Sequence, residues 1–511
     1  MVGIRVLTAF VTISMSTAAA TGVAAAAPHE RPNIVLIQTD DEPASMLDPA
    51  VMPLTLDAFS DGVRFDNYIV TTSQCCPSRA TLLTGQYPHN SGVTSNIPGY
   101  PALREKANTL ATWLQKAGYN TAHIGKYMNG YESSKGSAVA PGWSEWRTML
   151  RGAYFGYSLS HNGRFVRYGT ADDDYLTRVL NGFAVDLIRN LAPRKKPFYL
   201  QLDEFAPHVG AGRGSGDCGQ TAISAVPDPR DEARYAGAAL PTGPAYNEDD
   251  VSDKPSYIQA RRQFVPAQFD EITRQYRCAL GSIPAVDRGV ARVFAALRAT
   301  SSLRNTVVIF TSDNGYQYGE HRVPVGKGLP YEESLRVPLL VRMPHRPIYA
   351  ATRSTSLNAT VANLDIAPTL LQLAGAEPCI GPDRCRRLDG RSFVRLLKDR
   401  HPAWASNRAI VASFDINLPS YGFSCRYDGL RTATSIYIEH QLLPSGASRT
   451  CTPSTETELY DLSADPFELA NVSNTGDPRQ ASMAALLASI RDCSGIKGRD
   501  APPPSGVAYC R

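Results

Sequence analysis

The sequence predicts an α/β protein: a large, mostly parallel sheet sandwiched by helices, followed by a smaller α+β unit. Short β-branched runs alternate with amphipathic helical patterns along most of the chain, which is typical of a parallel sheet covered by helices. At 511 residues the chain is too long for one ordinary domain. We expect a leader over residues 1–27, a large domain over 30–378 and a second domain over 379–511.

The first 27 residues have the composition of a secretory signal peptide. They carry one charge, at Arg5, followed by an apolar stretch and by small residues that satisfy an A-x-A cleavage rule. A membrane anchor is the alternative, but the segment lacks a sustained run of about 20 strongly apolar residues. No later segment is apolar enough over that length either. We therefore expect a secreted, extracellular protein with no membrane span.

Two buried runs, NIVLI from residue 33 and VVIF from residue 307, have the pattern of strands and end in oxygen-rich segments. Ligands of open parallel sheets lie beyond the carboxyl ends of the strands, so these segments could meet. Hard oxygen donors suit Ca²⁺ or Mg²⁺ and not a zinc site dominated by His and Cys. Each segment alone is also explained by helix capping or a turn, but their matched form favours a metal site. The four side chains are Asp40, Asp41, Asp313 and Asn314.

Basic side chains follow other predicted strands. NTAHIGKYMNGY places Lys126 at a strand end, and KPFYLQLDEFAPH ends in His208. A lone lysine is more often a solvated charge and a lone histidine a structural one, so neither is diagnostic by itself. His321 and Lys327 fall in a Gly- and Pro-rich loop before a further strand near 337–341. A basic loop that folds over a metal site would suit an anionic substrate.

The second domain is predicted from the segments after residue 378. RAIVASFD, LRTATSIYIEH and TELYDL are strand-like, and QASMAALLASIRDC, from Gln480, is helix-like. The balance of 52 basic and 48 acidic residues gives a net charge of +4, which is too small and too evenly spread to predict nucleic acid or a charged membrane as a partner. Small molecules or glycans are the expected ligands.

Ten cysteines in an exported chain suggest disulfides. Sequence proximity suggests three pairs and elimination a fourth, and this connectivity is a hypothesis: Cys379 with Cys385, Cys425 with Cys451, Cys493 with Cys510, and Cys218 with Cys278. The adjacent Cys75 and Cys76 are left without partners. A disulfide framework therefore does not explain them.

The segment CCPSRATLLTG, from Cys75 to Gly85, resembles the signature of the sulfatase family. In that family the first cysteine is oxidised to formylglycine, and a formylglycine-generating enzyme would be the partner during maturation. The segments NLDIAPTLLQLAGA at 363–376 and ELYDLSADPFELANV at 458–472 extend the resemblance over most of the chain. It implies an alkaline-phosphatase-like fold. The alternative is a buried cysteine pair before a capped helix.

The resemblance implies a role for each matched residue. Residue 75 would be a hydrated aldehyde, with one hydroxyl that attacks sulfur and a second that later expels sulfate. One Ca²⁺ would bind the four oxygen-donor residues together with residue 75. Arg79, about one helical turn further on, would stabilise the alkoxide or the metal cluster. Lys126, Lys327 and His208 would bind sulfate, and Lys327 or His208 would assist the leaving alcohol.

One position departs from the family pattern. Many members read G-K-W-H, whereas GKYMNG here places Met128 where a histidine helps to break down the sulfated intermediate. His208 and His321 are the candidates to replace that base, and the sequence does not choose between them. The branch similar to N-acetylglucosamine-6-sulfatases commonly reads G-K-Y-L-N. The segment CCPSRATLLTGQYPHN and an insert over 209–262, ending near AYNEDDVSDKPSYIQ, also resemble that branch, and we expect the insert to form a substrate rim near His208.

The expected function is a Ca²⁺-dependent sulfuric ester hydrolase that removes 6-O-sulfate from N-acetylglucosamine in glycans. A broad-range arylsulfatase acting on aryl sulfate esters is one alternative. A phosphodiesterase or phosphonate hydrolase is another, because sulfate and phosphate esters are similar tetrahedral anions. An inactive glycan-binding relative is the alternative outside enzymes, and the presence of Cys75, Arg79 and all four metal ligands argues against it.

Overall fold

The computed structural model describes residues 1–3, 31–212, 218, 224–350, 352–415, 426–442 and 452–511. Most of the predicted leader and the predicted pair Cys425–Cys451 lie outside these residues. Among the described cysteines, three predicted disulfides are confirmed: Cys218–Cys278, Cys379–Cys385 and Cys493–Cys510. Cys75 and Cys76 are free and buried.

A ten-stranded sheet forms the centre of the molecule, in the order β11-β2-β10-β9-β1-β8-β4-β5-β6-β7. The five neighbours from β9 to β5 are parallel, whereas β10, β6 and β7 pair antiparallel. The strands are β1 (Asn33–Asp40), β2 (Val63–Phe65), β4 (Asn120–Gly125), β5 (Glu145–Met149), β6 (Ser158–His161), β7 (Arg164–Arg167), β8 (Phe198–Pro207), β9 (Thr306–Ser312), β10 (Leu339–Arg342) and β11 (Thr355–Leu357).

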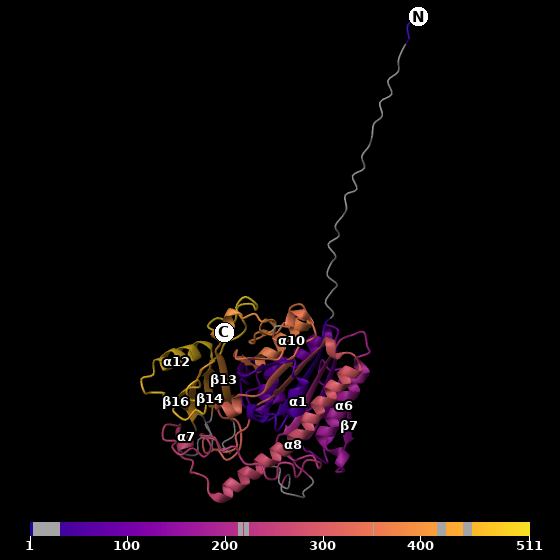
Figure 1. The fold of residues 1–511 in the computed structure, drawn as a ribbon. Coiled ribbons are helices and arrows are strands. Elements are labelled where there is room, and N and C mark those ends of the chain that lie inside the picture. The colour runs from indigo at the N-terminus through magenta and orange to yellow at the C-terminus, as the bar shows by residue number, and fades with distance from the viewer. Residues whose placement is uncertain (4–30, 213–217, 219–223, 351, 416–425, 443–451) are drawn as a thin grey trace.

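The central strands are apolar on both faces because helices cover both. Ile34 and Leu36 of β1 pack into one apolar cluster, and Val35 and Ile37 pack into another on the opposite face. The first cluster includes α2 (Cys75–Thr84), α4 (Leu110–Lys116) and α10 (Ile366–Ala374). The second includes α6 (Leu176–Leu191) and α8 (Pro266–Ala299), with α1 (Pro53–Ala58) against it, and Figure 1 shows α6 and α8 side by side.

A second sheet of four antiparallel strands lies beside the first, in the order β13-β14-β15-β16. Its strands are β13 (Ile410–Asp415), β14 (Arg426–Arg431), β15 (Ser435–Leu442) and β16 (Thr452–Asp461), and α12 (Pro478–Ile490) packs on it. The predicted fold class, a large mostly parallel sheet with a smaller C-terminal unit, is confirmed. The remaining short elements are β3 (Tyr68–Ile69), β12 (Val361–Ala362), α3 (Pro88–Ser91), α5 (Tyr131–Lys135), α7 (Ser256–Gln259), α9 (Glu332–Leu335) and α11 (Ala403–Ser406).

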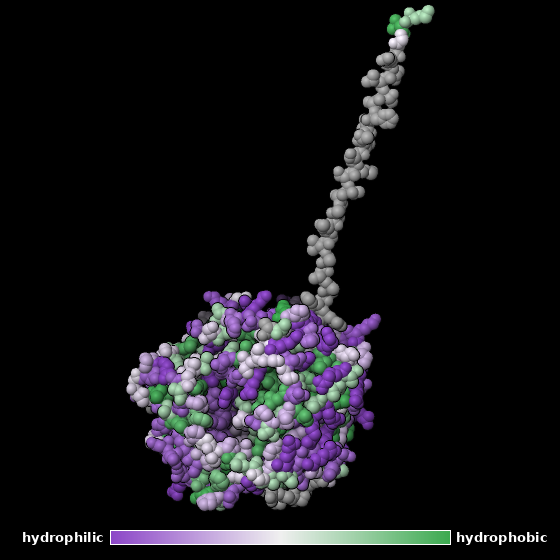
Figure 2. Space-filling view, viewed as in Figure 1, coloured by the Kyte–Doolittle hydropathy of each residue, from purple (hydrophilic) through white to green (hydrophobic). Residues whose placement is uncertain are grey.

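The surface mixes hydrophilic residues with scattered apolar ones on the face that Figure 2 shows. Exposed large apolar side chains are spread over several elements, among them Phe165 in β7, Phe269 in α8 and Phe467 after β16. Within the described residues, no helix has the length and apolar character to cross a membrane.

Strand register fixes where the functional segments leave the sheet. Gln38 of β1 is aligned with Asp203 of β8, and Gly125, the last residue of β4, is aligned with the same Asp203. Gly125 has a φ of 96°, and a Cβ there would lie 1.8 Å from the carbonyl oxygen of Asp203. Only glycine therefore fits at the strand end that directs Lys126 out of the sheet.

We expect Gly125→Ala to lower the free energy of unfolding by about 2 kcal/mol or more, because the methyl group adds both backbone strain and overlap with a strand. Thermal unfolding of the purified protein checks this. Gly136→Ala is the control, since Gly136 also has a positive φ, 59°, but a Cβ there would meet no atom within 4 Å. An equal loss in both variants would show that overlap at Gly125 is unimportant.

Candidate active site

The carboxyl ends of the parallel strands bring most of the predicted site residues together. β1 ends at Asp40, and Asp41 follows with a left-handed backbone, φ 72°. Cys75 begins α2 beside them, with its Sγ 3.2 Å from an Asp40 oxygen. The residues that leave the other strand ends are Lys126 after β4, His208 after β8, and Asp313 and Asn314 after β9.

Cys75 is buried and its thiol is not poised for attack. It is 1% exposed; its Sγ donates to Oδ1 of Asp40 and lies 2.7 Å from Nζ of Lys327. Burial and the negative charge of Asp40 raise the pKa of the Cys75 thiol far above its ordinary value. A neutral thiol is a weak nucleophile. The Cys75 thiol is therefore held neutral, between a carboxylate and an ammonium.

Arg79, one helical turn after Cys75, ties three strand ends together. Its Nε donates to Oδ2 of Asp313 at 2.8 Å, its Nη1 donates to the carbonyl of Lys126 at 2.8 Å, and its Nη2 lies 3.5 Å from Oδ2 of Asp40. Burial acts to lower the pKa of Arg79, but the charges of Asp313 and Asp40 outweigh it and raise that pKa. The guanidinium is therefore always charged and fixes both carboxylates.

The two buried carboxyls of Asp40 and Asp313 differ in the direction of their pKa shifts. Burial acts to raise the pKa of Asp40, but Lys126, His208 and Arg79 hold it well below its usual range. Lys126 Nζ contacts Asp40 Oδ2 directly. Burial and the charge of Asp40 raise the pKa of Asp313 to about 6. The charge of Asp40 thus opposes the ionisation of Asp313, and a cation beside both carboxyls would favour it.

The ammonium of Lys327 lies among the predicted metal ligands. It contacts Oδ1 of Asp41 and lies 3.5 Å from Oδ1 of Asn314. Asp41 and Asn314 are also joined, by a hydrogen bond of 2.6 Å from the amide to the carboxylate. The Lys327 ammonium thus supplies positive charge at two of the oxygens that are predicted to bind the metal ion. Lys327 comes from the loop after β9, as predicted, and that loop does fold back over the strand ends.

The donor set fits a hard divalent cation. Oδ2 of Asp41 accepts no hydrogen bond from the described residues. The ligand atoms of Asp40, Asp41, Cys75 and His208 all lie within 4.8 Å of one another. The main-chain nitrogen of Asp41 donates to Asp313 at 3.2 Å, which brings that carboxylate alongside. Carboxylate and amide oxygens are the ligands that Ca²⁺ prefers, so the residues present are compatible with the predicted ion.

His208 presents an unprotonated nitrogen to this group. Its Nδ1 lies 2.6 Å from the carbonyl oxygen of Val209, which can only accept, so Nδ1 carries the hydrogen. Its Nε2 lies 3.8 Å from Oδ2 of Asp41. Burial and the charge of Lys126 lower the pKa of His208 to about 4, so the ring is neutral near pH 7. Two acceptors therefore face each other, which favours a cation or a proton donor between them.

Two supporting residues were not predicted from the sequence. His123 in β4 bonds Oδ2 of Asp203 in β8 at 2.9 Å and Oγ1 of Thr148 at 2.6 Å. Asp203 lies 3.7 Å from Nη1 of Arg79 and so braces the guanidinium. Both residues lie within buried strands and have the burial of core positions. The available signal was a titratable side chain inside a predicted buried strand.

Two predicted positions lie apart from this group. His321 bonds Oε2 of Glu248 at 2.9 Å and stacks on Tyr331 with ring centroids 4.0 Å apart. Its described contacts include none of the residues around Cys75, so His208 is the histidine that the structure brings to the site. Met128 is buried in the apolar core, where it offers no base.

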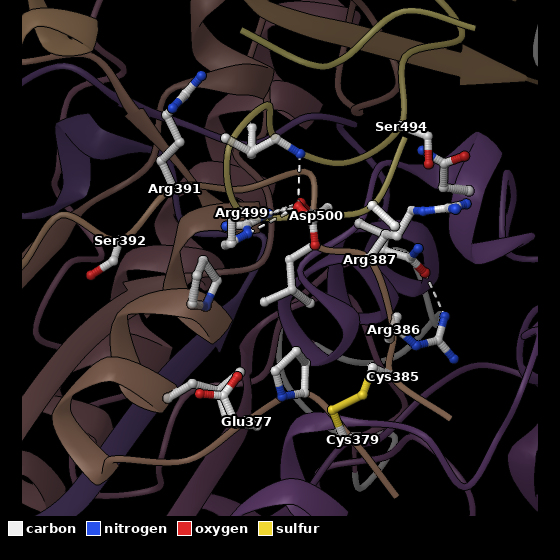
Figure 3. A pocket seen from close by; sticks show the side chains of 18 of the residues that line it. Glu377, Cys379, Cys385, Arg386, Arg387, Arg391, Ser392, Ser494, Arg499 and Asp500 are labelled. Carbon is white, nitrogen blue, oxygen red and sulfur yellow. Dashed lines mark hydrogen bonds and ion pairs between the residues drawn. A yellow bond between two sulfur atoms is a disulfide. The ribbon is translucent and has the colours of Figure 1, made fainter. Parts of the chain in front are cut away.

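A cavity of about 1110 Å³ lies elsewhere in the molecule, next to the Cys379–Cys385 disulfide (Figure 3). None of the predicted site residues lines it. In Figure 3 the side chains of Arg499 and Asp500 face each other, and they form an ion pair of 2.8 Å. Arg386, on the other side, is bonded to main-chain carbonyls and Gln86. The cavity is therefore separate from the candidate active site.

Two family descriptions match the sequence. One, named Sulfatase, matches residues 32–376, and the other, the C-terminal region of N-sulphoglucosamine sulphohydrolase, matches residues 319–492. An arylsulfatase of Volvox carteri is 33% identical over 92% of this chain and 76% of its own length. Human N-acetylglucosamine-6-sulfatase is 27% identical over 92% of this chain and 86% of its own length.

Solved structures show the same fold. BT4656, in complex with its substrate D-glucosamine-2-N,6-O-disulfate, superposes with a TM-score of 0.68 at 23% identity, covering 90% of this chain and 97% of that chain. At 23% identity, this structural match supports the fold and not the activity. The family match, in contrast, covers more than half of the sequence and includes the strand ends and helix that form the site. The chain belongs to the sulfatase family.

Proposed function

We propose that this sulfate ester hydrolase uses formylglycine, made from Cys75, and one Ca²⁺ to remove 6-O-sulfate from N-acetylglucosamine in glycans. The observation that carries the mechanism is the setting of Cys75: a buried, neutral thiol at a helix start, in contact with a carboxylate and a lysine. A buried, neutral thiol of this kind is a weak nucleophile. The same position is well suited to an oxygen nucleophile beside a cation.

The modified residue and the cation would each add one chemical capability. Hydrated formylglycine at position 75 would supply one hydroxyl as the nucleophile toward sulfur and a second that would let sulfate leave without a further attack on sulfur. Ca²⁺ would supply positive charge that favours an ionised hydroxyl and the sulfate oxygens, and the residues proposed to hold it are Asp40, Asp41, residue 75, Asp313 and Asn314.

The chain's own side chains bind the substrate and move protons. Lys126, which contacts Asp40, and Lys327, which contacts Cys75, are proposed to bind the sulfate oxygens. Lys327, which reaches residue 75, is proposed to donate the proton that the leaving alcohol needs. His208 is proposed to take a proton at Nε2, because its Nδ1 is already bonded to a carbonyl. Arg79 acts by orienting the carboxylates of Asp40 and Asp313.

The glycan substrate is supported by the match to human N-acetylglucosamine-6-sulfatase, which spans nearly the whole chain. The arylsulfatase of Volvox carteri, at a higher identity, supports the alternative of a broad-range arylsulfatase. We also propose export from the cell, because three disulfides are formed among the described residues and stable disulfides are typical of oxidising compartments.

Substrate choice is tested by comparing kcat/KM for N-acetylglucosamine 6-sulfate, 4-nitrophenyl sulfate and bis(4-nitrophenyl) phosphate. We expect the sulfated sugar to exceed the aryl sulfate by at least about tenfold, equivalent to about 1.4 kcal/mol of transition-state binding. A preference for the aryl sulfate would favour the arylsulfatase alternative, and a preference for the phosphodiester would contradict sulfatase action.

Cys75→Ala should abolish turnover, whereas Cys76→Ala, at the neighbouring buried thiol, should retain it.

Two substrates that differ in their leaving group distinguish the roles of Lys126 and Lys327. We expect Lys126→Ala to lower kcat/KM by about 10²–10³-fold on both sulfates, because a sulfate contact is lost in each. Lys327→Ala should cost more on the sugar sulfate than on 4-nitrophenyl sulfate, because nitrophenolate leaves without a proton.

Lys195→Ala, at an exposed lysine, is the matched control and should leave both rates unchanged. Circular dichroism and thermal unfolding establish that each variant folds. Equal losses on the two substrates for Lys327→Ala would rule out its role as proton donor and leave it as a sulfate contact only.

A further inference from the structure

A second group of metal-ligating side chains, two of them buried and one half-buried, includes a residue of the loop that follows β9. It is formed by His321 in that loop, Glu333 in α9 and Glu468 in the segment after β16. One ligand atom from each residue lies within 4.8 Å of the other two. His321 and Glu333 are close in sequence, whereas Glu468 comes from the C-terminal part of the chain, so the group joins that part to the large sheet region.

The facing atoms of this group have no partners. His321 and Glu468 are both 0% exposed. Nε2 of His321, Oε2 of Glu333 and Oε1 of Glu468 form no hydrogen bond with any residue that the structure describes. Nε2 of His321 lies 4.0 Å from Oε2 of Glu333. A buried polar atom without a partner costs about 1–3 kcal/mol, and one cation between these three atoms would satisfy all of them.

In His321 and Glu468, the side-chain atom that points away from the group is held by a hydrogen bond. Nδ1 of His321 lies 2.9 Å from Oε2 of Glu248, and the other oxygen of Glu248 lies 3.0 Å from Nζ of Lys254. A carboxylate on Nδ1 leaves the lone pair of Nε2 directed toward the group, as in metal-bound histidines. Oε2 of Glu468 accepts a hydrogen bond from the main-chain nitrogen of Glu332 at 2.8 Å, which leaves Oε1 as the oxygen that can bind a metal ion.

Two neighbouring carboxyls already have side-chain partners. Glu332 is bonded to Arg431 at 2.8 Å, and Glu458 is bonded to His440 at 2.7 Å. Glu468 has no ion pair of this kind among the described residues. Glu468 therefore differs from these neighbours, because neither of its oxygens has a cationic partner among the described residues.

We propose that His321, Glu333 and Glu468 bind a divalent transition-metal ion of the zinc class, which ties the loop after β9 to the segment after β16. One imidazole nitrogen with two carboxylate oxygens is a donor set that suits Zn²⁺, whereas Ca²⁺ and Mg²⁺ take oxygen ligands. The ion is structural and distinct from the Ca²⁺ proposed beside residue 75. It gives His321 a role outside the sulfate chemistry.

The test uses the full-length purified protein and Zn²⁺ alone as the probe. Metal analysis by mass spectrometry should find about one Zn²⁺ per chain, and adding Zn²⁺ to chelator-treated protein should raise the thermal midpoint. Glu468→Gln, which keeps the shape but removes the anionic donor, should weaken Zn²⁺ binding at least about tenfold. Glu204→Gln, at a glutamate buried elsewhere, is the matched control and should bind Zn²⁺ as the wild type does.

A visible absorption spectrum of the Co²⁺-substituted wild type gives a readout that needs no variant and no turnover. Saturable Co²⁺ bands that Zn²⁺ displaces are the expected result. The proposal fails if the wild type binds neither ion, or if Glu468→Gln and the wild type bind Zn²⁺ equally; a proton on Glu468 would then neutralise the group instead. Because these measurements do not depend on sulfate hydrolysis, their failure leaves the proposed function untouched, and the reverse also holds.

Discussion

The buried guanidinium of Arg79 is the interaction on which the candidate site depends. It bonds Asp313 and the carbonyl of Lys126 and lies beside Asp40, so one side chain holds the ends of β9, β4 and β1. Burying a charge is costly unless it is paired, and here the same pairing that offsets the cost also fixes the carboxylates. Asp203, held by His123, extends this support into the sheet.

The second sheet contributes to the same site from a distance. Oγ of Ser73, just before α2, donates to the carbonyl of Leu329 and lies 3.1 Å from the hydroxyl of Tyr427 in β14. Phe414 of β13 packs within 3.2 Å of the position that a Cβ would occupy at Gly328. Since Lys327 directly precedes Gly328 and Leu329, the C-terminal sheet helps to position the lysine that faces residue 75. Both parts of the chain therefore contact the segments that form the candidate site.

Sequence reasoning succeeded where the signal was local. Strand-end carboxylates, the nucleophile motif and the strand and helix patterns are each contained in a short segment, and the sheet register brings the strand-end side chains together. It missed the pair His123–Asp203 and the surroundings of His321. Buried polar pairing depends on which distant segments meet: Glu248 and Glu468 reach His321 or its neighbours from 73 and more residues away, and no local pattern specifies such partners.

The chemical identity of residue 75 is the most direct test of formylglycine-dependent catalysis in this protein. Trypsin should release residues 65–79 as one peptide that contains both cysteines, and its mass distinguishes an aldehyde from a thiol at each position. In active protein we expect an aldehyde at residue 75 and an unchanged thiol at Cys76. Full sulfatase turnover by protein in which Cys75 is entirely a thiol would contradict this mechanism.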